Sequence, residues 1–437
     1  MAWDFETEPE FEAQLAWMRS FVAEEVEPLD LLWPRFHHAP PPPWLRAVID
    51  PLKQQVKDRG LWACHLGPDL GGKGFGQVKL ALMNEILGRT RWGPTIFGCQ
   101  APDTGNAEIL AHYGTSEQKA KYLQPLLDGE VFSAFSMTEP QGGADPTQFR
   151  TRAVREGDEW IIHGEKFFTS NARNAAFFIV MALTNPDAGP YKGTSMLLVP
   201  SDTPGVVIER DVGTMGEELG AEGGHAYIRY DAARVPAENL LGDEGLGFVV
   251  AQTRLGGGRI HHAMRTVGVC NLAFEMMCER ALSRETKGEA LAEKQLVQQA
   301  IAESWAEIQQ FRLFVLYTAW KIDRSGTAAV RKEIASATIQ AAKVLRSVVE
   351  RSVHVHGALG VSNEMPLGYM WMLAPMMGIM DGPTEVHTVT AARQILKDFK
   401  PADGAWPSRW IPGALEHARA KHADALAAQA AAGAEEG

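Results

Sequence analysis

One carboxylate in the sequence stands where a general base could work. Asp381 follows an apolar, methionine-rich run, Met370 to Met380, and comes just before GPTEVH, where a helix is expected to start. A carboxylate in such a place is partly withdrawn from water, and enzymes tune acid and base residues in this way. The residue types also fit a second interpretation, in which Asp381 and Gly382 only form the turn before the helix. Taken alone, the turn is the commoner meaning of Asp-Gly.

Two further segments have the composition of a cofactor-binding surface. In FSAFSMTEPQGGAD, from Phe132 to Asp145, a strand pattern runs into a turn of small residues, where the backbone can approach a flat ring or a pantetheine arm closely. In the second segment, Lys166 to Asn171, aromatic faces stand beside hydroxyls, a combination that could flank a planar cofactor. Each segment alone also fits an ordinary strand and turn.

Two pairs of histidines raise the question of a metal. His261 and His262 are adjacent, and His354 and His356 are two apart, but neither pair has a carboxylate or cysteine at the spacing of metal ligands. We therefore predict no metal site, and we expect these histidines to be packed or hydrogen-bonded.

The composition restricts the class of protein. The chain has 437 residues, a length typical of two or three domains, and its 45% hydrophobic and 22% charged residues are typical of soluble globular proteins. Its net charge of -12 has the wrong sign for binding a nucleic-acid backbone. The acidic N-terminus predicts no secretory or transit peptide, and no apolar run is long enough to span a bilayer. The four cysteines form no C-x-x-C pair and fit reduced thiols in a cytoplasmic protein: Cys64, Cys99, Cys270 and Cys278.

The elements that must position these residues are predicted from hydrophobic periodicity. Residues 1–129 have helical patterns, beginning with a capping box at Thr7 to Glu10 and a first helix that ends near Pro28. Residues 243–400 return to long helical periods, and the alanine-rich tail, 401–437, is predicted to be a surface helix or partly disordered. Between them, residues 130–242 alternate β-rich runs with turns, and the expected strands are Trp160–Ile162, Phe177–Val180, Met196–Val199, Val206–Ile208 and Tyr227–Tyr230.

Six segments, in order along residues 10 to 398, together resemble the acyl-CoA dehydrogenase family, flavoproteins that oxidise the Cα–Cβ bond of acyl-CoA thioesters. They are RSFVAEEVEP, GPDLGGKGFG, YGTSEQKAKYLQPLLDGE, FSMTEPQGGAD, GEKFFTSNA and MDGPTEVHTVTAARQIL. Within the family, GRIHHAMRTVG and DGPTEVH are most similar to the branch that in animals is fused to a kinase-like domain, an extension not expected here.

The resemblance implies an α+β fold with three parts: an all-α N-terminal domain, a barrel-like middle β-sheet domain and a C-terminal four-helix bundle. It implies FAD as cofactor, bound at the subunit boundary of a homotetramer or at least a dimer, and an electron-transfer flavoprotein as the electron acceptor. No nucleic acid and no membrane span are expected.

The resemblance also assigns FAD contacts to individual residues. Phe135, Ser136, Met137 and Thr138 would hydrogen-bond the flavin pyrimidine through their strand. Phe168 and Ser170 would cover the ring and reach N5, while Arg284 and Gln295 would reach the FAD of a neighbouring subunit. The remaining FAD surface would be lined by His354, Gly357, Ala358, Pro383, Thr384 and Glu385.

For the substrate, the resemblance makes Asp381 the base that removes the α-proton. Most of the family has Glu at this position, so the shorter arm requires a shifted backbone or a different substrate, because a misplacement of about 1 Å can cost on the order of a hundredfold in rate. Some members place the base where this chain has Gly258, which closes that route. Arg259 would contact the CoA arm, and Ala144, Gly258 and Gly382 would touch the substrate near its thioester.

Three departures from the family pattern bear on substrate geometry: Ala144 replaces a serine, Phe168 a tryptophan and His354 a glutamine. Three alternatives to a dehydrogenase stay open, namely an acyl-CoA oxidase that uses oxygen directly, a nitroalkane-oxidase-like enzyme, which also has an Asp base, and an inactive acyl-CoA-binding protein. For the dehydrogenase, a role in fatty acid β-oxidation is expected. The small residues Gly256 to Gly258 favour a bulky acyl group, long, branched or hydroxylated.

Overall fold

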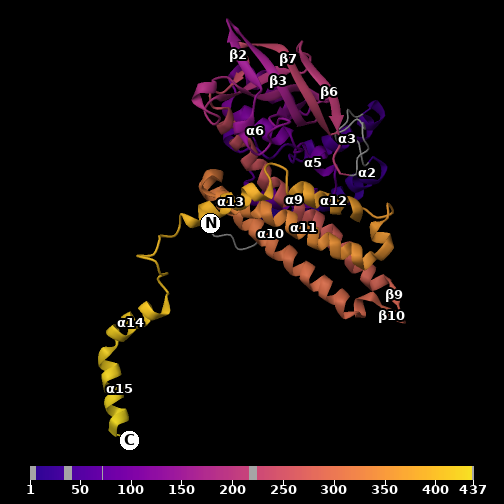
Figure 1. Ribbon diagram of the computed structural model, residues 1–437. Coiled ribbons are helices and arrows are strands. Elements are labelled where there is room, and N and C mark those ends of the chain that lie inside the picture. Colours follow the sequence, from indigo (N-terminus) through magenta and orange to yellow (C-terminus); the bar gives the residue numbers. More distant parts are fainter. Residues whose placement is uncertain (1–5, 34–41, 71, 216–223, 436–437) are drawn as a thin grey trace. The chain divides into compact units, whose positions relative to one another are not determined.

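The computed structural model describes residues 6–33, 42–70, 72–215 and 224–435, so Gly71 of the GPDLGGKGFG segment lies outside the described residues. The chain divides into two units, Met1–Ala391 and Ala392–Gly437. The first unit contains helices, then a sheet, then long helices again (Figure 1), so the α+β fold expected from the sequence is confirmed.

The N-terminal part is helical. Its first helix begins without a capping box, because Glu8 is the N-cap residue and provides no side-chain cap. Nor does the helical chain end near Pro28, since a π-helical turn, Val22–Val26, leads into α2, where the proline stands in the first turn and its missing N–H costs no hydrogen bond. The helices are α1 Pro9–Phe21, α2 Glu27–Leu32, α3 Pro43–Asp58, α4 Gln77–Leu87, α5 Gly93–Ile96, α6 Asp103–Tyr113, α7 Ser116–Gln118 and α8 Gln124–Asp128.

The middle part is one sheet, with strand order β6-β7-β3-β2-β4-β5-β8 and β1 parallel to β4. Both faces of β4 are covered, since Phe177 and Ile179 pack towards α6 while Phe178 and Val180 pack with Trp160 on the other face. This burial explains its unbroken apolar sequence. All five expected strands lie within strands of the structure, which are β1 Phe132–Ser136, β2 Arg152–Glu156, β3 Glu159–Ser170, β4 Ala175–Leu183, β5 Thr194–Pro200, β6 Val206–Val212, β7 His225–Pro236 and β8 Leu240–Leu241.

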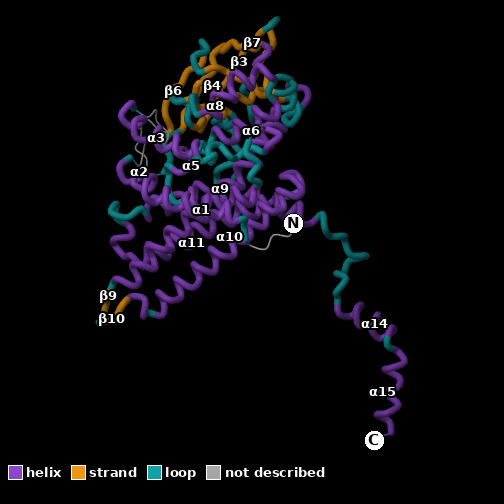
Figure 2. Tube along the Cα trace, turned by 180° about the vertical axis from the view of Figure 1, so that it is seen from behind, coloured by secondary structure: helices purple, strands orange, loops and turns teal. Residues whose placement is uncertain are grey.

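The C-terminal part of the first unit is a bundle of long helices around a core that includes Met264, Phe311, Val315 and Val348 (Figure 2). Its central helix α9 has 37 residues and is therefore about 55 Å long at 1.5 Å per residue. A short hairpin, β9 Glu285–Thr286 with β10 Glu289–Ala290, joins α9 to α10. The helices are α9 Gly247–Ser283, α10 Gln295–Ala329, α11 Arg331–His356, α12 Leu367–Met377 and α13 Thr384–Leu396.

The second unit contains the alanine-rich tail, with two exposed helices, α14 Ile411–Lys421 and α15 Ala423–Glu435. The expected domain limits at residues 129 and 242 fall between α8 and β1 and between β8 and α9. The four cysteines are free thiols. Over the described ranges, no helix combines the length and the apolar character needed to cross a membrane.

Candidate active site

Asp381 lies in the short loop between α12 and α13, against the side of α9. Its backbone has a φ of 54°, in the left-handed region, and its carbonyl oxygen accepts a 2.8 Å hydrogen bond from Nε of Arg259. Its carboxylate is 19% exposed, and Oδ2 lies 3.5 Å from Nε2 of His262. The hydrogen bond joins residues that are 122 positions apart in the sequence, and Asp381 stands just before the start of α13 at Thr384.

Gly258 is what allows this approach. A Cβ atom at Gly258 would stand 2.9 Å from Oδ2 of Asp381, closer than an ordinary contact, so any larger residue would displace the carboxylate. The next residue in the loop, Gly382, has a φ of 115°, and a Cβ there would lie 3.1 Å from Nε2 of His387. The left-handed turn and the bare surface of α9 together bring the short arm of Asp381 to the helix.

The ring of His387 is buried beside this loop. Burial lowers the pKa of His387 to about 4, and the nearby Arg259 guanidinium lowers it further. Burial also lowers the pKa of Arg259, while Asp381 opposes that effect. At neutral pH the loop therefore lies beside the cationic guanidinium of Arg259 and the neutral imidazole of His387.

A network of hydrogen bonds links α9 to the first strand of the sheet. Arg254 donates from Nε to Asn106 on α6 at 2.8 Å, and Nδ2 of Asn106 donates to Oγ of Ser133 at 2.9 Å. The buried carboxylate of Asp103 accepts from both the amide and the hydroxyl of Ser133, and burial raises the pKa of Asp103 to about 6. Arg254 also lies over the ring of Phe135, 4.1 Å from its centroid. The end of β1 is thus fixed relative to the α9 segment that faces Asp381.

Glu108, on the α6 face towards α9, is a second carboxylate in this region. Burial raises its pKa to about 7, although Arg254 opposes the shift. A Cβ atom at Gly257 would lie only 2.6 Å from Oε2 of Glu108, so the two helices meet closely. A cavity of about 40 Å³ beside Glu108 is also lined by His65 and His261, which is room for little more than water.

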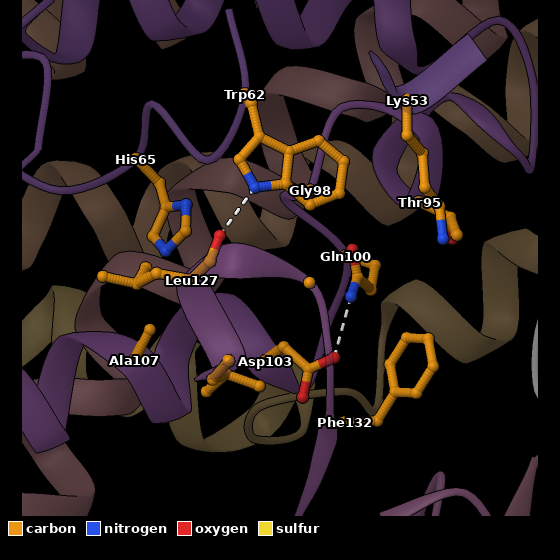
Figure 3. Close-up of a pocket in the computed structure, with 12 residues that line it drawn as sticks. Lys53, Trp62, His65, Thr95, Gly98, Gln100, Asp103, Ala107, Leu127 and Phe132 are labelled. Atoms are coloured by element: carbon orange, nitrogen blue, oxygen red, sulfur yellow. Dashed lines mark hydrogen bonds between the residues drawn. The ribbon is translucent and has the colours of Figure 1, made fainter. Parts of the chain in front are cut away.

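A second cavity, of about 10 Å³, lies by Asp103 (Figure 3). The figure shows Gln100 donating to Asp103, a 2.8 Å bond, and the indole of Trp62 donating to the carbonyl oxygen of Leu127 at 2.6 Å. This cavity holds a single water molecule at most. It belongs to the support of β1 rather than to a ligand site.

Polar groups at the end of β1, which was expected to face the flavin, already have hydrogen-bond partners within the protein. The Ser136 hydroxyl is buried and bonded to Thr169 and Tyr230, at 3.1 and 3.0 Å. The Met137 carbonyl oxygen accepts from Lys166 at 2.8 Å. Any contact from the Ser136 residue to a cofactor would therefore come from its backbone, whereas the side chain of Thr138 is only half-buried.

A buried ion pair holds the loop after β1. Nζ of Lys166 lies 2.8 Å from Oε1 of Glu139, and both side chains are almost fully buried. Glu139 also accepts from the amides of Arg150 and Thr151, at 2.6 and 3.0 Å. Burial alone would raise the pKa of Glu139, but Lys166 and these donors bring it below its ordinary value. The pair fixes β3 to the turn that carries the exposed residue Ala144.

Phe168 presents an aromatic face to the outside. It is 45% exposed, unusual for a phenylalanine, and its backbone has a φ of 53°. Its ring packs at 4.2 Å from Phe167 and edge-on to His225, whose Nδ1 lies 2.8 Å from Oγ of Ser170. An exposed aromatic ring of this kind can pack against a planar ligand.

Five of the other expected cofactor residues lie away from Asp381, towards the hairpin end of the bundle. Arg284 directly follows α9 and is 25 residues beyond Arg259, which corresponds to about 38 Å along the helix. Figure 1 shows the β9–β10 hairpin at this end and α13 at the other. All five are exposed: Arg284 and Gln295 flank the hairpin, and His354, Gly357 and Ala358 lie at or just after the end of α11.

Pro383, Thr384 and Glu385 lie at the start of α13, on the Asp381 side. The Thr384 hydroxyl donates to the carbonyl oxygen of Gly378 at 3.1 Å, while Glu385 is exposed. The structure thus brings together Gly258, Arg259, Asp381 and Gly382 and leaves the far-end residues outside this group. In the part of the chain that is described, no cluster of three or more metal-binding side chains occurs.

Several residues of the site were missed from the sequence. His262 was expected to be packed or hydrogen-bonded and was not connected with Asp381, but it lies four residues after Gly258 and so on the same face of α9, a signal that the spacing contains. Arg254, one turn before Gly258, carries the same signal. Glu108 and Asp103 could not be found in this way, since only the tertiary fold places α6 beside α9.

Three family models match successive parts of the chain. They are the N-terminal, middle and C-terminal domains of acyl-CoA dehydrogenase, over residues 8–130, 134–231 and 245–396. The chain therefore belongs to the acyl-CoA dehydrogenase family. It is an oxidoreductase of that family, and its cofactor is FAD.

Individual relatives agree with this assignment. FadE2 of Mycobacterium tuberculosis, described as a probable acyl-CoA dehydrogenase, is 44% identical over 371 residues, 84% of this chain and 88% of its own length. Acyl-CoA dehydrogenase family member 11 of Rattus norvegicus is 41% identical over 80% of this chain, which spans 45% of the rat protein. An acyl-CoA dehydrogenase-like structure from Mycobacterium abscessus has a TM-score of 0.83 at 36% identity, covering 91% of this chain and 100% of its own.

Proposed function

We propose that this protein removes the α-proton and the β-hydride of an acyl-CoA thioester to give the 2-enoyl-CoA, with Asp381 as the base. The observation that carries the proposal is the approach of the Asp381 carboxylate to the bare α9 surface at Gly258. In that place the carboxylate is 19% exposed, so a substrate can reach it, and it is anchored through its backbone by Arg259.

The residues around Asp381 supply the rest of the proton step. Breaking the α-C–H bond transfers the proton to the carboxylate and leaves the electron pair on the substrate, delocalised to its carbonyl oxygen. Arg259 and Gly382 border the loop where the thioester would lie, and the positive charge of Arg259 suits the CoA arm. FAD, when bound, supplies the acceptor for the β-hydride at N5.

The residues present fit FAD in two groups. Near the site, Phe168 offers an aromatic face, Ser170 ends the same strand, β3, and Thr138 follows the end of β1. Arg284 and Gln295 suit a diphosphate and adenosine. Arg284 lies about 38 Å along α9 from Arg259, and Gln295 lies beyond it at the start of α10, which supports the proposal that each FAD is held by two subunits of a dimer or tetramer.

The test is anaerobic mixing of the purified FAD-loaded protein with a panel of acyl-CoA thioesters of different chain length, branching and hydroxylation. We expect one or more to bleach the visible flavin band of the wild type and none to bleach that of Asp381→Asn. If no thioester bleaches the wild type, the proposal fails. Bleaching of both proteins at equal rates would support the proposed reaction but would show that Asp381 is not its base.

Two further outcomes decide the electron acceptor. We propose that an electron-transfer flavoprotein reoxidises the reduced protein, as expected for a dehydrogenase of fatty acid β-oxidation. Reoxidation in air within the turnover time would instead identify an oxidase. Bleaching by nitroalkanes but not by thioesters would identify a nitroalkane-oxidase-like enzyme. The expected cytoplasmic location stays a prediction.

A further inference from the structure

The Asp381 carboxylate is held by its backbone, but its two oxygens still have to be oriented. Arg259 anchors the carbonyl oxygen and Gly258 leaves space for Oδ2. Neither contact determines which carboxylate oxygen faces the substrate, since the side-chain torsion of an aspartate next to its carboxylate is broad. A third contact is needed to orient the carboxylate.

His262 is placed to make this contact. Its Nε2 lies 3.5 Å from Oδ2 of Asp381, and among the described residues it is the one Lys, Arg or His side chain within ion-pair distance of this carboxylate. It stands one helical turn after Gly258, so the glycine and the imidazole border the same oxygen. The imidazole is 23% exposed, which limits competition from water.

The charges around His262 favour a neutral ring. Burial lowers its pKa, the nearby Arg265 and Arg254 lower it further, and Asp381 opposes them. His261 beside it is also neutral, because burial lowers its pKa to about 3. Arg259 on α9 and His387 on α13 also act on Asp381, and Glu108 on α6 acts on Arg254. A neutral imidazole has one N–H and one acceptor nitrogen.

We propose that His262 is the positioning residue of the base, donating its Nε2–H to Oδ2 of Asp381 so that Oδ1 faces the α-carbon of the substrate. The inference rests on the proposed function. A separation of 3.5 Å is long for a hydrogen bond, and such contacts commonly shorten when the substrate binds. During the reaction the α-proton bonds to Oδ1, the electron pair stays on the substrate, and His262 keeps its proton.

This contact accounts for the use of an aspartate. The shorter arm needs the left-handed backbone of Asp381 and the bare surface at Gly258 to reach its place, and the imidazole then fixes its orientation. His262 acts through Asp381 and does not itself exchange a proton with the substrate. A loss of about 1 Å in position is of the size that costs on the order of a hundredfold in rate.

The test measures proton removal without hydride transfer. The probe is the 3-thia analogue of the thioester that bleaches the flavin fastest: its α-proton is acidic, and its β-position is sulfur, so no β-hydride exists. Removal of the α-proton gives an anion that forms a long-wavelength absorption band against oxidised flavin. Stopped-flow mixing with the FAD-loaded protein gives the rate of proton removal over a range of pH, and titration gives the affinity.

Three variants separate positioning from structure. His262→Phe keeps a ring without a donor, His262→Gln keeps a donor, and His261→Phe makes the same change at the adjacent buried histidine. We expect His262→Phe to slow band formation about 10- to 100-fold with the probe affinity within about twofold. As the pH is lowered, the rate of His262→Phe should also begin to fall at a higher pH than the rate of the wild type, because the ionised carboxylate has lost a hydrogen-bond donor. His262→Gln should recover most of the rate, and His261→Phe should match the wild type.

Two results would overturn the proposal while leaving the function intact. One is an unchanged rate and pH profile in His262→Phe. The other is an equal loss of rate in His262→Phe, His262→Gln and His261→Phe, which would show a general disturbance of α9. If no thioester bleaches the flavin of the wild type, the proposed function fails and the role of His262 fails with it. If the wild type is bleached but the variants give either result above, only the role of His262 fails.

Discussion

Replacing Gly258 with alanine tests the geometry of the base directly. The new Cβ would lie 2.9 Å from Oδ2 of Asp381, while ordinary contact begins at 3.4 Å, so the carboxylate has to retreat by about 0.5 Å. If about 1 Å costs a hundredfold, half of that costs roughly tenfold in the rate of α-proton removal. The loss is expected in the rate of flavin bleaching at saturating thioester, measured by anaerobic stopped flow.

The same substitution should stabilise the protein. Gly258 lies inside a helix, where alanine is favoured over glycine by about 0.5–1 kcal/mol. Gly256→Ala is the matched control, because the nearest atom to its new Cβ is a side-chain carbon of Thr327 at 4.0 Å. It should gain the same stability in urea unfolding and keep the full rate. Full activity in Gly258→Ala, or an equal loss of rate in Gly256→Ala, would refute the reasoning.

Four other substitutions test the surrounding contacts. Lys166→Met leaves Glu139 charged and buried and should cost about 3–5 kcal/mol in the free energy of unfolding in urea, with much of it recovered when Glu139→Gln is added. Glu108 has its pKa raised from 4.5 to about 7, so its protonated form contributes stability below pH 4.5 that is lost as the pH rises through 7. Glu108→Gln should therefore exceed the wild type in stability at pH 8 by on the order of 3 kcal/mol and match it at pH 4, as urea unfolding at both values will show. Phe168→Ala should weaken FAD binding roughly tenfold in a flavin-fluorescence titration, and an unchanged affinity would exclude ring contact. Arg284→Ala should weaken FAD binding about 10- to 100-fold while leaving the rate per bound FAD unchanged, and a loss of rate at full FAD occupancy would contradict its place far from Asp381.

The strands were predictable where their sequences were apolar. Phe177 to Val180 forms an apolar run that is buried on both faces, and it was recognised as a strand. By contrast, β2, Arg152–Glu156, was missed, because four of its five residues are exposed and its sequence is mostly charged. It is a strand because its backbone pairs with β3, which periodicity does not record.

For the first helix, local rules gave the wrong ends. Thr7 was expected to cap it, but Glu8 is the N-cap residue, and the Thr7 hydroxyl bonds to Glu12 instead. Pro28 was expected to end the helix, but a π-helical turn, Val22–Val26, precedes the proline, and a new α-helix, α2, begins at Glu27. A capping box does occur further on, at Thr115 and Gln118.

For the site, the sequence indicated Asp381 and the glycine before Arg259, since both stand in recognisable segments. It did not indicate the groups that orient them. Arg259 was expected to contact CoA, and its bond to the Asp381 carbonyl oxygen depends on the path of the loop after α12. The bonds from Asp103 to Ser133 likewise need α6 and β1 to be side by side, which no single segment encodes.

Two residues of the site, Phe168 in the sheet and Asp381 in the loop before α13, have left-handed backbones that glycine would adopt without cost. Each non-glycine residue in this region costs the folded state on the order of 1 kcal/mol. Selection for stability alone would therefore favour glycine at both positions and would abolish an aromatic face and a carboxylate. Glycine at either position should raise the thermal stability of the protein, but at Phe168 it should weaken FAD binding and at Asp381 it should inactivate the enzyme.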